Sequence, residues 1–262
     1  MKRLAIVGCG RLGTLVAKCY ADGILPEYQL VGLYSRSFES AQKLSSYLLQ
    51  RGISCPACSS YEELYAQNPD IIAEAASPAA VKSFALEALN RGISIALLSI
   101  GAFADDSFYE QTRQACIDGG SRVYLCSGAT GGFDVLRTVA LMGGATAQFF
   151  NEKGPRGLVG TDVYDNSLLT EQKEVFKGTA VEAIAKFPTR VNVTVAASRA
   201  SVGPENMQVT MQCSPYFIGD TQKVEIRNPQ VRAIVDVYSA TSEIAGYSLV
   251  STLQNIVSPI VF

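Results

Sequence analysis

The sequence predicts an α/β domain built on a parallel sheet, followed by a second domain of the α+β class. Over the first 126 residues, short apolar runs alternate with segments of helical periodicity, as in successive βαβ units. A glycine-rich turn separates the first apolar run from the first helical segment. After Ser127 the alternation stops, Gly and Thr become more frequent, and β-branched stretches appear.

The elements of the first domain follow from apolar spacing. Residues 4–7 form a continuous apolar run, which is typical of a strand buried on both faces. One face of the next helix carries five apolar residues at i, i+3, i+4, i+7 and i+8: Leu12, Leu15, Val16, Cys19 and Tyr20. Residues 29–34 predict a second strand, and Ser37 is expected to cap a helix whose apolar face is formed by Ala41, Leu44 and Leu48.

The alternation of predicted strands and helices continues to residue 126. Ser77 is expected to cap a helix that carries Pro78 in its first turn, where proline is tolerated. Further strands are predicted at residues 70–73, 93–99 and 122–126, and a further helix at 105–117.

The second domain is expected to be mainly antiparallel and to span residues 127–238. Its β-branched stretches predict strands at residues 190–196, 206–212 and 223–226. Residues 242–256 have helical spacing, so we expect residues 239–262 to return to the dinucleotide-binding domain formed by residues 1–126.

Composition excludes several classes of function. The 262 residues are 48% hydrophobic and 18% charged, which suits a globular core, and the net charge of -2 does not suit a nucleic-acid binder. No apolar run approaches the ~18 residues that span a bilayer, and the apolar run after Arg3 is too short for a secretory signal. The chain contains no histidine, which excludes Ser-His-Asp triads and H-E-x-x-H zinc sites.

The seven cysteines favour free thiols in a reducing cytoplasm, because a secreted disulfide framework would be denser and even-numbered. Cys55 and Cys58 form a C-x-x-C pair. A zinc site needs two further ligands that the neighbourhood lacks, and a redox site needs the first cysteine at a helix N-terminus. Two packed thiols are therefore the expected structure, and no metal site is predicted.

Residues 8–13 read G-x-G-x-x-G between a buried strand and an amphipathic helix, the context that a dinucleotide-binding turn requires. Gly8 permits the tight turn, Gly10 lets the backbone approach a pyrophosphate, and Gly13 permits close helix–strand packing. The sequence therefore predicts an α/β Rossmann-type dinucleotide-binding domain with a second α+β domain.

The end of the second strand indicates which cofactor binds. NAD sites usually place an acidic residue here to bond the ribose 2′-hydroxyl, but residues 34–37 read Tyr-Ser-Arg-Ser. Ser35, Arg36 and Ser37 favour the 2′-phosphate of NADP. The alternative is that Arg36 stacks on adenine or points to water, which leaves NAD usable.

A second glycine cluster, at residues 127–132 (SGATGG), follows the last strand of the first domain. Its place at the carboxyl end of the sheet suits a ligand site, and a hinge between domains is the alternative.

Several segments together resemble the L-aspartate dehydrogenase family. They occur in the family's order over nearly the whole chain: residues 8–13, 74–81 (EAASPAAV), 99–105 (SIGAFAD), 127–136 (SGATGGFDVL), 175–178 (VFKG), 181–183 (VEA), 187–188 (FP) and 192–193 (NV). The stretch at 127–136 is the most specific of them.

The resemblance implies a Rossmann domain plus an α+β domain that forms a homodimer. It implies oxidation of L-aspartate with NAD or NADP to iminoaspartate, which hydrolyses to oxaloacetate and ammonia or feeds NAD biosynthesis. Ala129 and Asn192 match family positions that contact the dinucleotide. With the fingerprint, the expected cofactor contacts are Gly8, Gly10, Arg11, Leu12, Gly13, Ser35, Arg36, Ser37, Ala76, Ser77, Pro78, Ala129 and Asn192.

The chain departs from the family at one important position. The family's catalytic histidine lies about 30 residues after that asparagine, and here its place is taken by Gln222. Glutamine orients a substrate or a water but does not titrate, and a positioned acid–base group is worth about 10²–10⁴ in rate. Asp220 and Lys153 are the other candidate catalytic groups. Lys153, Arg156 and Arg190 are candidates to hold the carboxylates of an anionic small-molecule substrate.

Three interpretations stay open from sequence. The first is an NAD(P)-dependent oxidoreductase acting at C2 of an amino or imino dicarboxylic acid. The second is the same fold acting on another carbonyl or imine. The third is a dinucleotide-binding sensor without turnover, for which the absent histidine is the argument.

Overall fold

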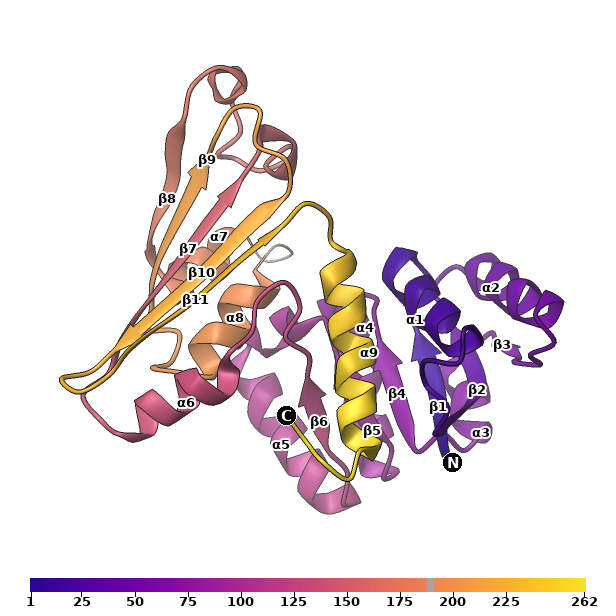
Figure 1. Ribbon diagram of the computed structural model, residues 1–262. Coiled ribbons are helices and arrows are strands. Elements are labelled where there is room, and N and C mark those ends of the chain that lie inside the picture. Colours follow the sequence, from indigo (N-terminus) through magenta and orange to yellow (C-terminus); the bar gives the residue numbers. More distant parts are fainter. Residues whose placement is uncertain (188–190) are drawn as a thin grey trace. The chain divides into compact units, whose positions relative to one another are not determined.

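The computed structural model describes residues 1–187 and 191–262, and the chain divides into two units (Figure 1). Unit 1 comprises residues 1–126 and 245–262, and unit 2 comprises residues 127–244.

Unit 1 is a six-stranded parallel sheet with the order β3-β2-β1-β4-β5-β6 (Figure 1). Its strands are β1 (Lys2–Val7), β2 (Tyr28–Tyr34), β3 (Ala57–Cys58), β4 (Ile71–Glu74), β5 (Ser94–Leu97) and β6 (Val123–Leu125). Its helices are α1 (Arg11–Ala21), α2 (Phe38–Gln50), α3 (Tyr61–Ala66), α4 (Pro78–Asn90), α5 (Asp106–Gly119) and α9 (Glu243–Val257). The order reverses between β1 and β4, as in a doubly wound dinucleotide-binding sheet.

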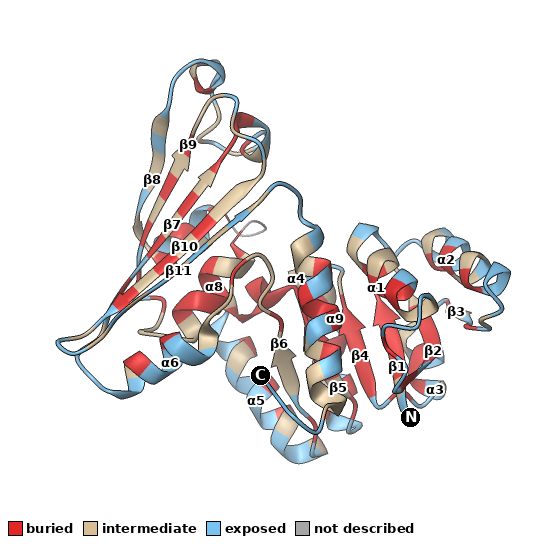
Figure 2. Cartoon of the chain, viewed as in Figure 1, coloured by how far each residue is buried: buried red, intermediate tan, exposed pale blue. Residues whose placement is uncertain are grey.

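Both faces of this sheet are covered, as the continuous apolar runs predict. Leu4 and Ile6 of β1 join one core cluster with residues of α1, α2 and α9, while Ala5 and Val7, which point to the other face, are also buried (Figure 2). The predicted cap at Ser77 is confirmed, because its hydroxyl accepts from Ala80 N at 3.2 Å. Ser37 stands at the N-cap of α2, but within the described chain its side chain makes no cap hydrogen bond.

The C-terminal helix α9 is held to the sheet of unit 1 by a buried tyrosine. Tyr28 is fully buried, and its hydroxyl donates to the Leu253 carbonyl at 2.7 Å. We expect Tyr28→Phe to lower the free energy of unfolding by about 1 kcal/mol, since the hydrogen bond is lost without a large change in shape. The urea midpoint measures this at unchanged m-value. Tyr247→Phe, on the exposed side of α9, is the control, and an equal loss there would contradict the assignment.

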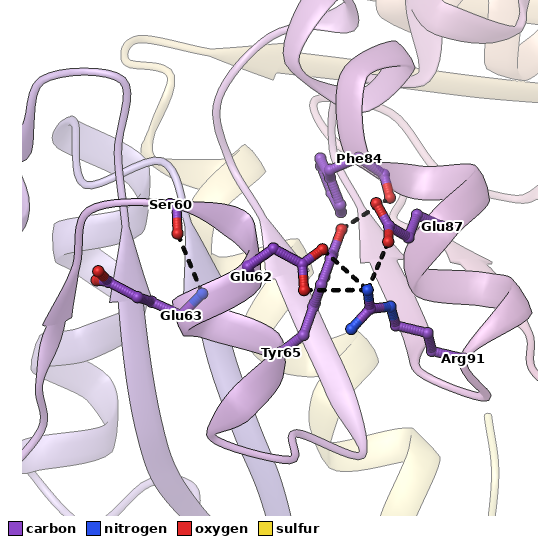
Figure 3. Close-up of polar contacts among 7 residues, drawn as sticks. All are labelled: Ser60, Glu62, Glu63, Tyr65, Phe84, Glu87 and Arg91. Atoms are coloured by element: carbon purple, nitrogen blue, oxygen red, sulfur yellow. Dashed lines mark hydrogen bonds and ion pairs between the residues drawn. The ribbon is translucent and has the colours of Figure 1, made fainter.

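The short helix α3 is tied to α4 by a surface network (Figure 3). Arg91 donates to Glu62 at 2.9 Å and to Glu87 at 2.6 Å, and its guanidinium lies 4.6 Å from the Tyr65 ring centroid. The Tyr65 hydroxyl donates to the Phe84 carbonyl. Ser60 caps α3 by accepting from Glu63 N. These contacts fix the start of α3 and therefore the ring of its first residue, Tyr61.

Unit 2 contains a five-stranded mixed sheet with the order β11-β10-β7-β9-β8. Its strands are β7 (Thr146–Lys153), β8 (Lys173–Thr179), β9 (Gln208–Cys213), β10 (Asp220–Arg227) and β11 (Arg232–Ser239). Its helices are α6 (Phe133–Leu141), α7 (Ala180–Lys186) and α8 (Asn192–Arg199), with 3₁₀ turns at Pro155–Gly157 and Asn166–Leu169. Only the β7–β9 pair is parallel among the described pairings, so the sheet is mainly antiparallel, as predicted.

One face of this sheet is buried and the other is accessible, which gives the strands their alternating burial (Figure 2). The strand predicted at residues 190–196 is wrong, because α8 begins at Asn192. Val195 and its neighbours in α8 are buried, and tertiary packing here overrides the preference of β-branched residues for strands. Pro188 and Arg190 lie outside the described residues.

Candidate functional site

A cavity of about 580 Å³ opens in unit 1 at the carboxyl ends of β1, β2 and β4, where the strand order reverses. It is lined by Val7, Gly8, Gly10, Tyr34, Ser35, Arg36, Ser37, Ser40, Tyr61, Ala75, Ala76, Ser77, Ala79, Ala80 and Ser83. Open α/β sheets bind ligands at such a point.

The glycine turn lines this cavity and packs closely against the loop that follows β4. Gly8 has φ +99°, and a Cβ there would lie 2.6 Å from the Ala75 carbonyl carbon. A Cβ on Gly13 would lie 1.8 Å from the Gly8 oxygen, so both positions require glycine. A Cβ on Gly10 would meet no described atom within 4 Å. The space beside Gly10 is therefore open to a ligand, as the pyrophosphate interpretation requires.

The N-terminus of α1 is suited to bind an anion. Gly10 is its N-cap residue and has no side chain to satisfy the first-turn N–H groups. Free N–H groups at the positive end of a helix dipole bind phosphate. Among the described residues that line the cavity, Arg36 alone carries a charge. The open space, the helix end and this guanidinium fit an anionic dinucleotide.

The wall beside Arg36 contains residues that the sequence analysis did not single out. The Tyr61 ring centroid lies 4.1 Å from that of Tyr34, and the Tyr61 hydroxyl lies 3.2 Å from Ser83 Oγ. Tyr61 opens α3 and Ser83 lies in α4, so only tertiary packing brings them to the end of β2. No sequence motif marks them.

A buried carboxyl group, Glu74 at the end of β4, organises the loop that lines the cavity. It is fully buried, and it accepts hydrogen bonds from Ala76 N at 2.7 Å, Ser99 N at 2.9 Å and Ser99 Oγ at 2.8 Å. Burial raises the pKa of Glu74, and the donors from Ser99 and Ala76 oppose that rise. These bonds connect the loops that follow β4 and β5.

Four of the cofactor residues predicted in unit 1 do not line the cavity. Leu12 packs inward against the core cluster, Gly13 lies behind Gly8, Arg11 is exposed at the first position of α1, and Pro78 is the first residue of α4. The predicted residues that do line it are Gly8, Gly10, Ser35, Arg36, Ser37, Ala76 and Ser77.

Unit 2 brings the three predicted catalytic residues together. In the β7–β10 register, Lys153 pairs with Asp220 and Asn151 pairs with Gln222. All four lie on the buried face of the sheet; Lys153 is 9% exposed, Gln222 8% and Asn151 1%. Lys153 Nζ lies 3.5 Å from Asp220 Oδ1. Asn151 is a member of this group that the sequence analysis missed.

The other predicted residues of unit 2 lie on separate elements. Ala129 is half-buried in the 127–132 turn, where Gly128 and Gly132 have positive φ. Asn192 is the first residue of α8, not a strand residue as its β-branched surroundings had indicated. Arg156 is exposed in the 3₁₀ turn after β7, and Arg190 lies outside the described residues.

The C-x-x-C pair consists of packed thiols. Cys55 and Cys58 are buried, all seven cysteines are free, and burial raises the pKa of Cys55 and of Cys9 to about 12. Such thiols stay protonated and unreactive at neutral pH. Within residues 1–187 and 191–262, no group of three or more acidic or cysteine side chains is placed to hold a metal ion. No helix in the same ranges is long and apolar enough to cross a membrane.

The reversed strand order, the glycine turn at the switch point and the cavity beside it define a Rossmann-type dinucleotide-binding protein. Residues 8–126 match the family model described as homoserine dehydrogenase, NAD binding domain. Residues 134–256 match the model described as aspartate dehydrogenase, C-terminal.

Proteins that are similar over most or all of the chain identify one family within this class. The L-aspartate dehydrogenase of Nitrosopumilus maritimus is 32% identical over 231 residues, which cover 86% of this chain and 83% of that protein. The L-aspartate dehydrogenase of Methanococcus maripaludis is 27% identical over 99% of this chain and 98% of that protein. The crystal structure of aspartate dehydrogenase from Thermotoga maritima is 25% identical, with a TM-score of 0.76 and coverage of 100% and 99%. The chain belongs to the L-aspartate dehydrogenase family of NAD(P)-dependent oxidoreductases, which confirms the predicted resemblance and fold class.

Proposed function

We propose that this protein catalyses the reversible, NADP-linked oxidation of L-aspartate to iminoaspartate. The observation that carries the proposal is the burial of Lys153 beside Asp220 and Gln222 on one sheet face, in a chain whose other unit holds the dinucleotide cavity. In the oxidative direction, L-aspartate and NADP⁺ give iminoaspartate, NADPH and a proton. Hydrolysis of the imine gives oxaloacetate and ammonium.

The residues of unit 1 bind and orient the cofactor. Gly10 and the N-terminus of α1 would hold the pyrophosphate of the dinucleotide, and Arg36 with Ser35 and Ser37 would hold its 2′-phosphate. Ala129 and Asn192 are the proposed contacts from unit 2. A bound nicotinamide supplies the hydride acceptor for C2 of the substrate.

The residues of unit 2 bind the substrate. Lys153 is nearly buried, so its ammonium group is a strong partner for a substrate carboxylate. Gln222 orients the reacting end by hydrogen bonding, and it neither takes nor gives a proton. Asp220 is the ionisable group beside it, with 43% of its side chain exposed.

We expect Arg36→Ala to weaken NADPH binding about 10- to 100-fold, since a hydrogen bond to a charged group is worth about 1.5–3 kcal/mol. NADH binding is expected to change little, because NADH has no 2′-phosphate. Fluorescence titration with both nucleotides measures the effect. Lys43→Ala removes a cation from α2 that pairs with Glu39 and serves as the control. Equal loss for both nucleotides would mean that Arg36 stacks on adenine.

The function is tested by adding oxaloacetate and ammonium to the purified protein with NADPH and following nicotinamide absorbance. Oxidation that requires both co-substrates is the expected result. NADPH binding without turnover would leave the second candidate, a dinucleotide-responsive sensor or an enzyme for another imine. The replacement of the family's histidine by Gln222 is the observation that favours that candidate.

The proposal includes a homodimer that acts in the cytoplasm. The accessible face of the unit 2 sheet carries Ile234 and Tyr238, which are 42% and 57% exposed, and a second copy would cover them. The seven free thiols suit a reducing compartment. Sedimentation equilibrium tests the assembly, and a monomer at micromolar concentration would contradict it.

A further inference from the structure

Two hydrogen bonds in series connect α3 to α4 in the wall of the unit 1 cavity. The Ser83 hydroxyl donates to the Ala80 carbonyl oxygen at 2.7 Å. A hydroxyl has one hydrogen, so Ser83 does not also donate to Tyr61. The Tyr61 hydroxyl, which lies 3.2 Å from Ser83 Oγ, is therefore the donor of that contact. Because the Tyr61 hydrogen points to Ser83, the Tyr61 oxygen offers a ligand only lone pairs.

A second phenol lies against Tyr61 and does not reverse this direction. The Tyr34 ring centroid lies 4.1 Å from that of Tyr61. Burial raises the pKa of the Tyr61 hydroxyl, the hydrogen bond with Ser83 opposes the rise, and Tyr34 adds to it, so the phenol stays protonated at neutral pH. Because that proton points to Ser83, Tyr34 meets the Tyr61 oxygen only as a donor. A phenol oxygen has two lone pairs, so one is left for a ligand.

The surroundings of Tyr61 suit a purine base. Tyr61 is half-buried and Ser83 is exposed, and both line the cavity together with Ala79 and Ala80 of α4. In an open α/β sheet with this strand order, the adenosine half of a dinucleotide binds beside the end of the second strand, here at Tyr34. The described residues that line the cavity include no carboxylate, so hydroxyl oxygens are its side-chain acceptors. The Tyr61 oxygen is the one whose direction is fixed.

We infer that the Tyr61 hydroxyl accepts a hydrogen bond from the 6-amino group of adenine and so selects 6-aminopurine dinucleotides over 6-oxopurine dinucleotides. The 6-amino group is a donor, whereas a 6-oxo group is an acceptor and would face the Tyr61 oxygen without a hydrogen between them. Ser83 is a positioning residue, because it fixes where the Tyr61 hydrogen points. This inference rests on the proposed binding of the dinucleotide in the cavity, and it depends neither on the 2′-phosphate nor on turnover.

Fluorescence titration with NADPH and with reduced nicotinamide hypoxanthine dinucleotide phosphate, its 6-oxo analogue, tests the inference by binding alone. We expect the natural protein to bind NADPH at least about tenfold more tightly than the analogue. Tyr61→Phe removes the hydroxyl and keeps the ring, so it should bring the two affinities within about threefold by weakening NADPH binding. Unchanged affinity of this variant for the analogue reports that it is folded. NADH and its 6-oxo analogue are compared in the same way, which makes the result independent of Arg36.

Two further variants separate base recognition from a structural effect. In Ser83→Ala the Tyr61 hydroxyl is free to turn and donate to a 6-oxo group, so the analogue should bind about 3- to 10-fold more tightly while NADPH affinity changes less. A general loosening of the cavity would instead weaken both nucleotides. Tyr65→Phe is the matched control, because the Tyr65 hydroxyl also joins α3 to α4, by donating to the Phe84 carbonyl at 3.1 Å, and Tyr65 is not a lining residue of the cavity. It should keep the natural preference.

The outcomes separate recognition of the base from the enzyme activity. Equal affinity of the natural protein for NADPH and its 6-oxo analogue, a Tyr61→Phe protein that keeps the preference, or a Tyr65→Phe protein that loses it would each overturn the inference. A preference that Tyr61→Phe abolishes and Tyr65→Phe keeps supports it even if oxaloacetate and ammonium give no turnover. That last result would remove only the proposed reaction.

Discussion

The Gln222→His variant is expected to oxidise L-aspartate about 10²- to 10⁴-fold faster than the natural protein between pH 7 and 8. The substrate's ammonium group must lose a proton before hydride leaves C2. Gln222 cannot accept that proton, whereas a neutral imidazole at the same place can. Position 222 lies directly across from Asn151, and Asp220 is the next residue of β10 on the same face of the sheet.

The kcat/KM of the Gln222→His variant is expected to decrease at low pH. A histidine has a pKa of about 6.5, and only its neutral form accepts a proton, so kcat/KM should fall as the pH drops through that region. In the natural protein no group at position 222 titrates, and the rate should continue to rise at higher pH as the free substrate amine deprotonates. Steady-state rates from pH 5.5 to 10 measure both profiles.

Gln222→Leu is the control for the histidine variant, because it fills the position without a base and should not gain rate. If Gln222→His is no faster than the natural protein and shows the same profile, the proton acceptor lies elsewhere. Asp220 would then be the group to replace next.

The second large effect is expected at Gly13, where Gly13→Ala should abolish measurable NADPH binding. A Cβ at this position would lie 1.8 Å from the Gly8 oxygen and 3.0 Å from the Gly8 carbonyl carbon. Backbone atoms cannot yield as a flexible side chain does, so α1 must move away from the glycine turn. We expect binding to weaken more than about 100-fold and the free energy of unfolding to fall by about 1–3 kcal/mol. NADPH fluorescence and urea unfolding measure the two quantities.

Gly10→Ala is the informative comparison. Its Cβ would meet no described atom within 4 Å, so the fold should keep its stability. The added methyl group would occupy the place proposed for the pyrophosphate, and NADPH binding should still weaken. Wild-type affinity in Gly10→Ala would show that the pyrophosphate does not pass this residue.

The first domain was predictable because its signals are local. Apolar runs mark strands such as β1, periodic apolar residues mark helices such as α1, and Ser77 with Pro78 marks a helix start. The glycine turn was predictable for the same reason, since the strand, the turn and the helix are consecutive in the chain. The family resemblance rests on short contiguous segments, and whole-chain relatives confirm it.

Local signals were misleading in unit 2. The run of β-branched residues around Val195 predicted a strand, but it forms the buried helix α8. A β-branched residue carries only a weak preference for strands, and packing against a sheet outweighs it. Strands β7, β8 and β11 lie outside the β-branched stretches from which strands were predicted.

The fold class, the glycine turn, the family and the absence of a histidine could all be predicted from the chain, because each is a property of adjacent residues or of composition. Tertiary packing was needed to bring Tyr61 and Ser83 to the cavity that Arg36 also lines, and to join Glu74 to Ser99. It also set the register that brings Asn151 and Lys153 opposite Gln222 and Asp220, about 70 residues later in the chain. A one-residue slip would turn all of these side chains to the other face. Strand register depends on packing across the whole sheet, and no short segment encodes it.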